Sequence, residues 1–177
     1  MNRETKVTGR IWCITDEGSS LIADIDTDQI YHNSHLAVTD VASMGAFAFG
    51  NLEGWEDFPE KAGAGDILVV GKNFGAGSSR QQAVDCFRSL GISAILGESF
   101  GAIYKRNAIN SGFPLLSCPH IGAGELKTGD HIEVDFQTGK ITGMERDKVL
   151  LQCQPFSHVQ MQIYKAGHLF AHGKKGD

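Results

Sequence analysis

The sequence predicts an α/β fold, with a mostly parallel sheet core, helices on the faces of the sheet, and additional antiparallel β elements. Two observations support this fold class. Residues 66–117 alternate short apolar runs with segments of helical periodicity, and this β, α, β, α, β order is typical of a parallel sheet covered by helices. Beyond residue 119, apolar and polar residues alternate singly, as they do in half-buried antiparallel strands.

Length and composition indicate a single domain over residues 1–177, large enough to bury a core. The net charge of −5 argues against nucleic acid or an anionic membrane as a partner. No apolar run reaches membrane-spanning length, and the first residues lack the apolar segment of a secretory signal. We therefore expect a cytoplasmic protein with no nucleic-acid or membrane partner, and a frayed tail at residues 173–177.

The four cysteines are widely scattered, at Cys13, Cys86, Cys118 and Cys153. No two of them have the spacing of metal-ligand pairs, so we expect this chain to bind no metal or iron–sulfur cluster by itself. Free thiols in a reducing compartment are the expected state of all four.

In chain order, the first strand is expected over residues 7–14, and residues 21–25 form a second short apolar segment. This segment runs directly into Asp26-Thr-Asp-Gln-Ile. An Asp-rich segment after a strand is normally a solvated turn or an Asx cap. Residues 31–39 are expected to form an irregular loop.

The next segment is expected to be a helix that Asp40 caps and that extends to about residue 49. Residues 51–65 form a polar loop, and we expect Trp55 and Phe58 to pin it to the body of the protein. This region therefore leads from the first strands to the central motif.

Residues 66–87 carry the most specific pattern in the chain. Residues 67–70 are a short β-branched run typical of a buried strand, and the turn after it contains Gly75 and Gly77, which tolerate unusual backbone angles. A helix follows, and its apolar face is made by Ala83, Phe87 and Leu90.

Four further elements complete the prediction. A buried strand is expected at residues 92–96, a helix between a Ser99 cap and Gly112, and a strand at residues 113–116. Antiparallel β structure is expected at residues 132–142. The last helix is expected to run from Pro155 to about Ala171, with an apolar stripe of Phe156, Val159, Ile163, Ala166 and Phe170.

Two interpretations of the central turn remain open from its residues alone. Ser78 with Gln81, or Ser79 with Gln82, fits a capping box, which needs no ligand. The same hydroxyls beside Arg80 at a helix N-terminus would equally suit a small carboxylate. Phosphate-loop, dinucleotide and serine-hydrolase motifs do not fit, because their required glycines or Gly-Lys-Ser/Thr order are missing.

Three motifs occur in order along the chain: Asp26-Thr-Asp-Gln-Ile, Gly71-Lys-Asn-Phe-Gly-Ala-Gly-Ser-Ser-Arg, and Ser99-Phe-Gly-Ala-Ile-Tyr-Lys-Arg-Asn-Ala-Ile-Asn-Ser-Gly. Together they resemble the small subunits of the aconitase superfamily, above all those of 3-isopropylmalate dehydratases. The resemblance implies a swivelling β/β/α domain. It also implies a hydro-lyase in which a separate large subunit, in a heterodimer or heterotetramer, carries a 4Fe–4S cluster and its Lewis-acid iron.

The resemblance assigns roles to residues of the motifs. Ser78 corresponds to the base that removes a proton from a carbon next to a carboxylate, and Arg80 to an anchor for a substrate carboxylate. A serine needs stabilisation of its alkoxide to act as a base, and backbone N–H groups and a guanidinium supply it. The remaining predicted substrate-binding residues are Ser79, Gly77, Asp26, Thr27 and Asp28.

The sequence departs from the family pattern in two places. Gln81 and Gln82 stand where the family usually has Glu-His, and the Pro that commonly follows the first motif is missing. The predicted substrate-specificity loop consists of His35, Leu36, Ala37 and Val38. Because no Arg or Lys lies between Gln29 and Gly50, we expect a small hydroxy-carboxylate substrate with an apolar substituent.

Alternatives of other classes remain at this point. The chain could serve a related dehydratase, of homoaconitase or methylmalate and dimethylmalate type, or it could be a non-catalytic module that binds a small anion. An isolated small subunit could also self-associate through the surface meant for its partner, and an exposed apolar patch would be the sign of this.

Overall fold

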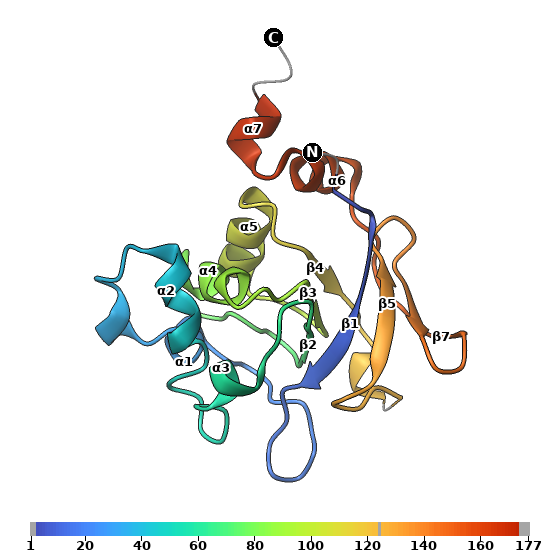
Figure 1. Cartoon of the computed structure of the whole chain (residues 1–177), viewed down its shortest axis with the longest axis horizontal. Helices are drawn as coiled ribbons and strands as arrows, with labels where there is room; N and C mark the ends of the chain where they lie inside the picture. The colour runs from blue at the N-terminus through green and yellow to red at the C-terminus, as the bar shows by residue number, and fades with distance from the viewer. Residues whose placement is uncertain (1–2, 124, 174–177) are drawn as a thin grey trace.

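The computed structural model of the chain describes residues 3–123 and 125–173, so residues 174–177 of the predicted tail lie outside it. Within these ranges, one mixed sheet has the strand order β4-β3-β2-β1-β5-β6-β7 (Figure 1). The strands are β1 (Lys6–Cys13), β2 (Ile67–Val70), β3 (Ala94–Gly97), β4 (Leu115–Ser117), β5 (His131–Asp135), β6 (Lys140–Gly143) and β7 (Lys148–Gln152).

The sheet has a parallel half and an antiparallel half that meet at β1. Strand β1 pairs parallel with β2, as do β2 with β3 and β3 with β4. On its other side β1 pairs antiparallel with β5, and β6 and β7 continue as a meander. The predicted α/β fold class with antiparallel additions is confirmed, although β7 is not among the predicted strands.

The helices are short, and α1 to α5 gather on one side of the parallel strands (Figure 1). They are α1 (Thr27–Ile30), α2 (Val41–Met44), α3 (Phe58–Lys61), α4 (Gln82–Ser89), α5 (Ala102–Asn110), α6 (His158–Ala166) and α7 (Leu169–Gly173). Single 3₁₀ turns occur at η1 (Asn33–His35), η2 (Gly45–Phe47) and η3 (Ile121–Ala123). No helix in the described ranges is both long and apolar enough to cross a lipid bilayer.

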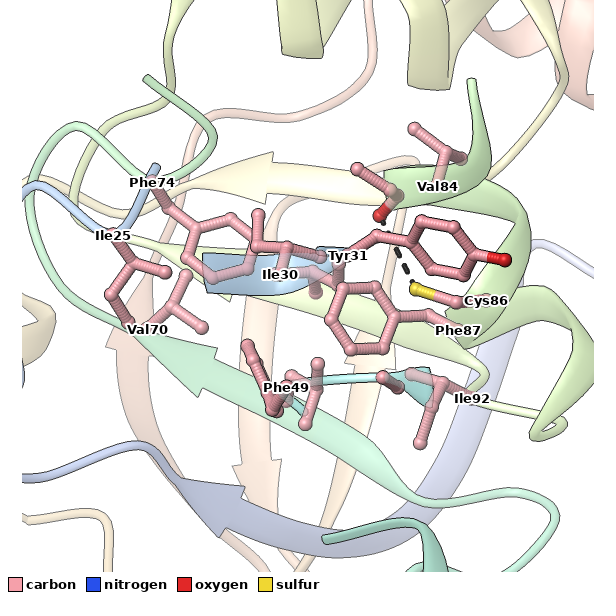
Figure 2. Close-up of a cluster of buried hydrophobic side chains, with 14 of the residues drawn as sticks. Ile25, Ile30, Tyr31, Phe49, Val70, Phe74, Val84, Cys86, Phe87 and Ile92 are labelled. Atoms are coloured by element: carbon pink, nitrogen blue, oxygen red, sulfur yellow. Dashed lines mark hydrogen bonds between the residues drawn. The ribbon is translucent and has the colours of Figure 1, made fainter. Parts of the chain in front are cut away.

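The strands of the parallel half are buried on both faces. In β2, Leu68 and Val70 face the cluster beneath α1 to α5, whereas Ile67 and Val69 face a second cluster beneath the antiparallel strands and α6. Figure 2 shows the first cluster, in which the rings of Phe49 and Phe87 lie with their centroids 5.0 Å apart. This core holds the end of β2 and the helices that follow it in fixed positions.

Two of the segments that precede the glycine-rich turn differ from the prediction. Residues 21–25 form no strand, and only Leu21 makes an isolated bridge, to Thr15. The rest of the segment bonds single backbone groups of a turn instead, since the Asp24 N–H donates to the Lys72 carbonyl and the Ile25 carbonyl accepts from the Gly75 N–H. The helix capped by Asp40 ends at Met44 and continues as a 3₁₀ turn, with Gly45 packed against Ser89 and Leu90. Trp55 and Phe58 do pin the 51–65 loop, since Phe58 is fully buried.

The last predicted helix is two helices, because Gly167 adopts a positive φ of 99° and ends α6. Phe156 and Ile163 of the predicted apolar stripe are buried, but Val159 is 57% exposed and Phe170 is 79% exposed. Tyr164 takes the inward position instead, and its ring contacts Phe136 and Phe156.

The expectation of four free thiols is wrong, because Cys118 and Cys153 form a disulfide. Their Cα atoms lie 4.3 Å apart although the residues are 35 positions apart in sequence. The sheet curls so that the segments after its two edge strands, β4 and β7, come together, and the Gln154 N–H donates to the Ser117 carbonyl at 2.9 Å. Sequence spacing did not indicate this tertiary approach. Cys13 and Cys86 are free and buried.

Candidate functional site

The glycine-rich turn after β2 is held by its backbone. The Gly75 N–H donates to the Ile25 carbonyl at 2.8 Å, and the Thr27 N–H donates to the Ala76 carbonyl at 2.9 Å. Gly75 has a φ of +79°, and a Cβ at this position would overlap the Tyr104 ring, so only glycine fits. The first and second sequence motifs therefore pair at the carboxyl end of β2.

The first motif builds a capped helix start. The Asp26 carboxylate accepts hydrogen bonds from the Asp28 and Gln29 N–H groups, and the Gln29 side chain accepts from the Asp26 N–H, which completes a capping box. Thr27 is 3% exposed, and its hydroxyl donates to the Ser78 carbonyl at 2.9 Å. The Asx-cap interpretation of this segment is confirmed, and Thr27 orients the turn that carries Ser78.

The capping box proposed for Ser78 or Ser79 is wrong. Helix α4 begins at Gln82 with Gln81 as its N-cap, and no side chain caps it. Ser79 is occupied elsewhere, because its Oγ accepts a hydrogen bond from Asn107 Nδ2 at 2.9 Å. Within residues 3–123 and 125–173, the Ser78 hydroxyl makes no hydrogen bond, and the N–H groups of residues 78–82 donate to no protein acceptor. The exposed turn thus presents one uncommitted hydroxyl beside five uncommitted backbone donors.

Arg80 is fixed from one side. Its Nη1 donates to Asp28 Oδ1 at 2.7 Å and to the Tyr31 carbonyl at 2.9 Å, and its side chain is 14% exposed. The guanidinium holds the pKa of the Asp28 carboxyl below its ordinary value, while partial burial acts in the opposite direction. Among the described residues, Nε and Nη2 of Arg80 have no acceptor, so they are available to an anion.

Asp28 is itself held by three neighbours. Its Oδ1 also accepts the Asn33 N–H at 3.0 Å, and its Oδ2 accepts from Asn51 Nδ2 at 3.2 Å. His32 Nε2 lies 3.9 Å from the same oxygen. Because these contacts fix the carboxylate, they also fix the direction in which Arg80 points.

The predicted specificity loop, residues 35–38, begins four residues after Tyr31. The His35 ring stacks on Phe47 with centroids 4.0 Å apart, and Val38 packs against the main core cluster. Leu36 and Ala37 are exposed. Of the four loop residues, Leu36 therefore provides the large apolar side chain that another molecule can contact.

Ser78, Ser79, Gly77 and Arg80 come together with Asp26, Thr27 and Asp28, as the motifs predicted. Direct contact of these residues with a substrate stays a prediction. Sequence reasoning missed Asn51, which donates a hydrogen bond to Asp28, and Asn107, which donates one to Ser79. Asn107 lies in the third motif, which was a usable signal; Asn51 lies in a polar loop and carried none. Across the described part of the chain, no three His, Cys, Asp or Glu side chains are grouped to hold a metal ion.

Comparison with known proteins places this site in a family. The Aconitase C-terminal domain family matches residues 50–119, which include the glycine-rich turn and α5. Over 169 residues the chain is 37% identical to the isopropylmalate/citramalate isomerase small subunit of Methanocaldococcus jannaschii, covering 96% of this chain and 94% of that protein. The chain belongs to the family of aconitase-type small subunits.

Two further comparisons bear on this small subunit. It is 35% identical over 153 residues to the methanogen homoaconitase small subunit of M. jannaschii, with 86% of each chain covered. Its fold matches the crystal structure of a 3-isopropylmalate dehydratase from M. jannaschii, with a TM-score of 0.81, 32% identity, and coverage of 96% of this chain and 94% of that one. The family and fold expected from the three motifs are confirmed.

Proposed function

We propose that this small subunit belongs to a hydro-lyase that moves water across two adjacent carbons of a hydroxy acid of isopropylmalate type. The observation that carries the proposal is the exposed Ser78 hydroxyl, which has no partner among the described residues and lies on the same turn as Arg80. A purely structural serine at a helix start would cap the helix, and this one does not.

In this proposal Ser78 Oγ removes a proton from the carbon next to a substrate carboxylate. The alkoxide that makes Ser78 a base is stabilised by the N–H groups of residues 78–82, which have no other acceptor in the described structure. The Nε and Nη2 groups of Arg80 bind the carboxylate, while Asp28 and Tyr31 hold Nη1. Gly77, which is exposed and has a φ of +91°, lets the substrate approach the backbone.

The proposal assigns the 4Fe–4S cluster to a large subunit. The cysteines of this chain do not fit an iron–sulfur cluster. Cys118 and Cys153 are bonded to each other, and Cys13 and Cys86 are buried in two different hydrophobic cores. Ser78, Ser79 and Gly77 are exposed, which supports a site completed by another chain. The complex is a heterodimer or a heterotetramer in this proposal.

For the substrate we propose an apolar substituent. The loop that follows Tyr31 has no Arg or Lys, and Leu36 is its exposed large side chain. The isopropylmalate/citramalate isomerase small subunit among the relatives is named for substrates of this kind. Clear preference of the assembled enzyme for homocitrate or homoaconitate would contradict the proposal.

The deciding experiment is Ser78→Ala in the complex with the large subunit. We expect kcat to fall about 10³-fold with KM for isopropylmalate changed little, because only the proton transfer is lost. The melting temperature should not change, since Ser78 caps no helix. Ser20→Ala, at an exposed turn, is the control.

Near-normal turnover of the Ser78→Ala complex would refute the role of Ser78 as the base. If the wild-type complex turns over no hydroxy acid while the isolated chain binds a small carboxylate, the chain is a non-catalytic anion-binding module instead.

A further inference from the structure

The loop between α1 and α2 is tied to α4 through its main chain. Arg80 Nη1 donates to the Tyr31 carbonyl at 2.9 Å, and Gln82 Nε2 donates to the Leu36 carbonyl at 3.4 Å. At the other end of α4, Ser89 Oγ donates to the Ala42 carbonyl at 2.8 Å. All three bonds run from a side chain of the 80–89 segment to a backbone oxygen. Two of these oxygens, at Tyr31 and Leu36, hold the loop, and the third, at Ala42, lies in α2.

These bonds place the loop relative to the proposed carboxylate anchor. Arg80 and Gln82 are two residues apart, and they hold carbonyls that are five residues apart, at Tyr31 and Leu36. Tyr31 is fully buried against α4 (Figure 2), and its hydroxyl donates to the His35 carbonyl at 3.2 Å. The loop is therefore anchored before Leu36 by Tyr31, and at Leu36 itself by Gln82.

The side chain of Leu36 is free while its carbonyl is held. It is 39% exposed, whereas the neighbouring His35 stacks on Phe47 and Val38 packs on the core. Rotating the Leu36 peptide would move this side chain relative to Arg80. Gln82 makes the side-chain hydrogen bond to that peptide group, and no other described side chain does.

We propose that Gln82 is a positioning residue for substrate selection: its amide holds the Leu36 carbonyl and thereby sets where the Leu36 side chain meets the apolar substituent of the substrate. The inference rests on the proposed function. It gives a role to one of the two glutamines that depart from the family pattern. The other, Gln81, is the N-cap of α4. Its amide donates to Asp85 Oδ1 at 3.2 Å and makes no hydrogen bond to the described residues of the loop.

The matched test compares Gln82→Met with Gln81→Met, because each removes one amide without adding charge. Activity of the assembled enzyme is measured with isopropylmalate and with citramalate, which differ in the size of the apolar substituent. For Gln82→Met we expect kcat/KM for isopropylmalate to fall about five-fold, since one long hydrogen bond is lost, with citramalate nearly unaffected. Gln81→Met should leave the ratio of kcat/KM for isopropylmalate to kcat/KM for citramalate unchanged.

Gln82→His, which keeps a ring N–H donor, should restore the wild-type ratio. If Gln82→Met only destabilised the protein, kcat/KM would fall equally for isopropylmalate and citramalate, and Gln82→His would not change the ratio of the two values. An unchanged ratio in Gln82→Met, or an equal change in Gln81→Met, would overturn the proposal.

A second readout needs no activity. Hydrogen exchange of the Leu36 and Val38 amides in the isolated chain should be faster in Gln82→Met than in wild type or Gln81→Met, because these amides bond within the loop. Equal exchange in all three chains would overturn the positioning role even if turnover changed. Faster exchange together with a wild-type complex that turns over neither substrate would instead refute the proposed function.

Discussion

Asp28 neutralises Arg80 on one side and leaves its other nitrogens open. Both carboxylate oxygens of Asp28 are occupied, by Arg80 and the Asn33 N–H on one and by Asn51 on the other. The arginine is thus already oriented before any ligand arrives. In the proposed function this preorganisation reduces the ordering that substrate binding would otherwise require.

Replacing Asp28 tests the ion pair through its pH dependence. The pair with Arg80 lowers the pKa of Asp28, so its stabilisation is fully present above the ordinary pKa of an aspartate and is lost as pH falls through the lowered value. Asp28→Asn should lower the free energy of unfolding at neutral pH by about 0.5–1 kcal/mol, since the pair is partly exposed. Urea unfolding at neutral and acidic pH measures this.

The difference between wild type and Asp28→Asn should close at acidic pH. Asp57→Asn is the control, because the Asp57–Lys61 pair is more exposed and joins only the N-cap of α3 to its last residue. A difference that stays constant down to the lowest pH at which the protein folds would contradict the ion-pair account.

At this scale the sequence predicted which residues meet but not all of their partners. Ser78, Arg80 and Asp28 stand in motifs and were found. The contacts of Asn51 and Gln82 were not predicted. Asn51, in a polar loop, hydrogen-bonds a residue 23 positions away, and Gln82, at a helix start, hydrogen-bonds a residue 46 positions away. Such distances are set by tertiary packing, which periodicity and spacing do not report.

Among the elements, the segments joined by Cys118 and Cys153 follow the two edge strands of the sheet. Both sulfurs are buried, and the bond closes a loop that contains β5 to β7. Closing a loop of this length restricts the unfolded chain and stabilises the fold by about 3–4 kcal/mol in the chain-entropy view.

Thiol counting checks this bond. In denaturant without reductant we expect two reactive thiols, Cys13 and Cys86, and with reductant all four. In the native protein neither should react readily, because burial raises the pKa of Cys13 to about 11 and raises that of Cys86 further. The Cys118→Ala/Cys153→Ala double variant should melt about 10 °C lower.

Reductant should lower the melting temperature of wild type and leave the double variant unchanged. Cys13→Ala, with the disulfide intact, is the control and should still respond to reductant. Four thiols in denaturant alone would rule the bond out.

Elements with a strong local pattern were predicted, and those that depend on packing were not. The parallel strands have continuous apolar runs and appear where expected. The break between α6 and α7 was missed because Gly167 lies in an otherwise helical pattern. Gly167 is the C-cap of α6: its φ is 99° and its N–H donates to the Ile163 and Tyr164 carbonyls. A glycine inside an apolar periodic segment does not by itself indicate whether it ends the helix.

On the scale of the whole molecule, the candidate site lies on an open surface beside the parallel half. Exposed apolar side chains occur on the elements around it, with Leu36 and Val41 on the loop side and Ile103 in the first turn of α5. Asn107, one turn after Ile103 on the same helix face, bonds Ser79. Such a rim would be covered by a large subunit, or by a second copy when the chain is alone.

We therefore expect the isolated chain to be folded and without hydro-lyase activity, and activity to appear when the large subunit is added. Ile103→Asp should weaken assembly at least ten-fold in titrations followed by turnover at saturating substrate, because it buries a charge in the contact. Val159→Asp, on the exposed face of α6, is the control and should assemble normally. Full activity of the chain alone would contradict the expectation.

The covalent link between the two ends of the sheet also determines what a protease can remove. The turns of the antiparallel half, including the exposed stretch at residues 144–147, lie inside the loop that the disulfide closes. A single cut there leaves both fragments joined, and neither carries away a residue of the candidate site. A nicked chain would run as one band on a non-reducing gel and as two after reduction, with Ser78 and Arg80 on the same piece.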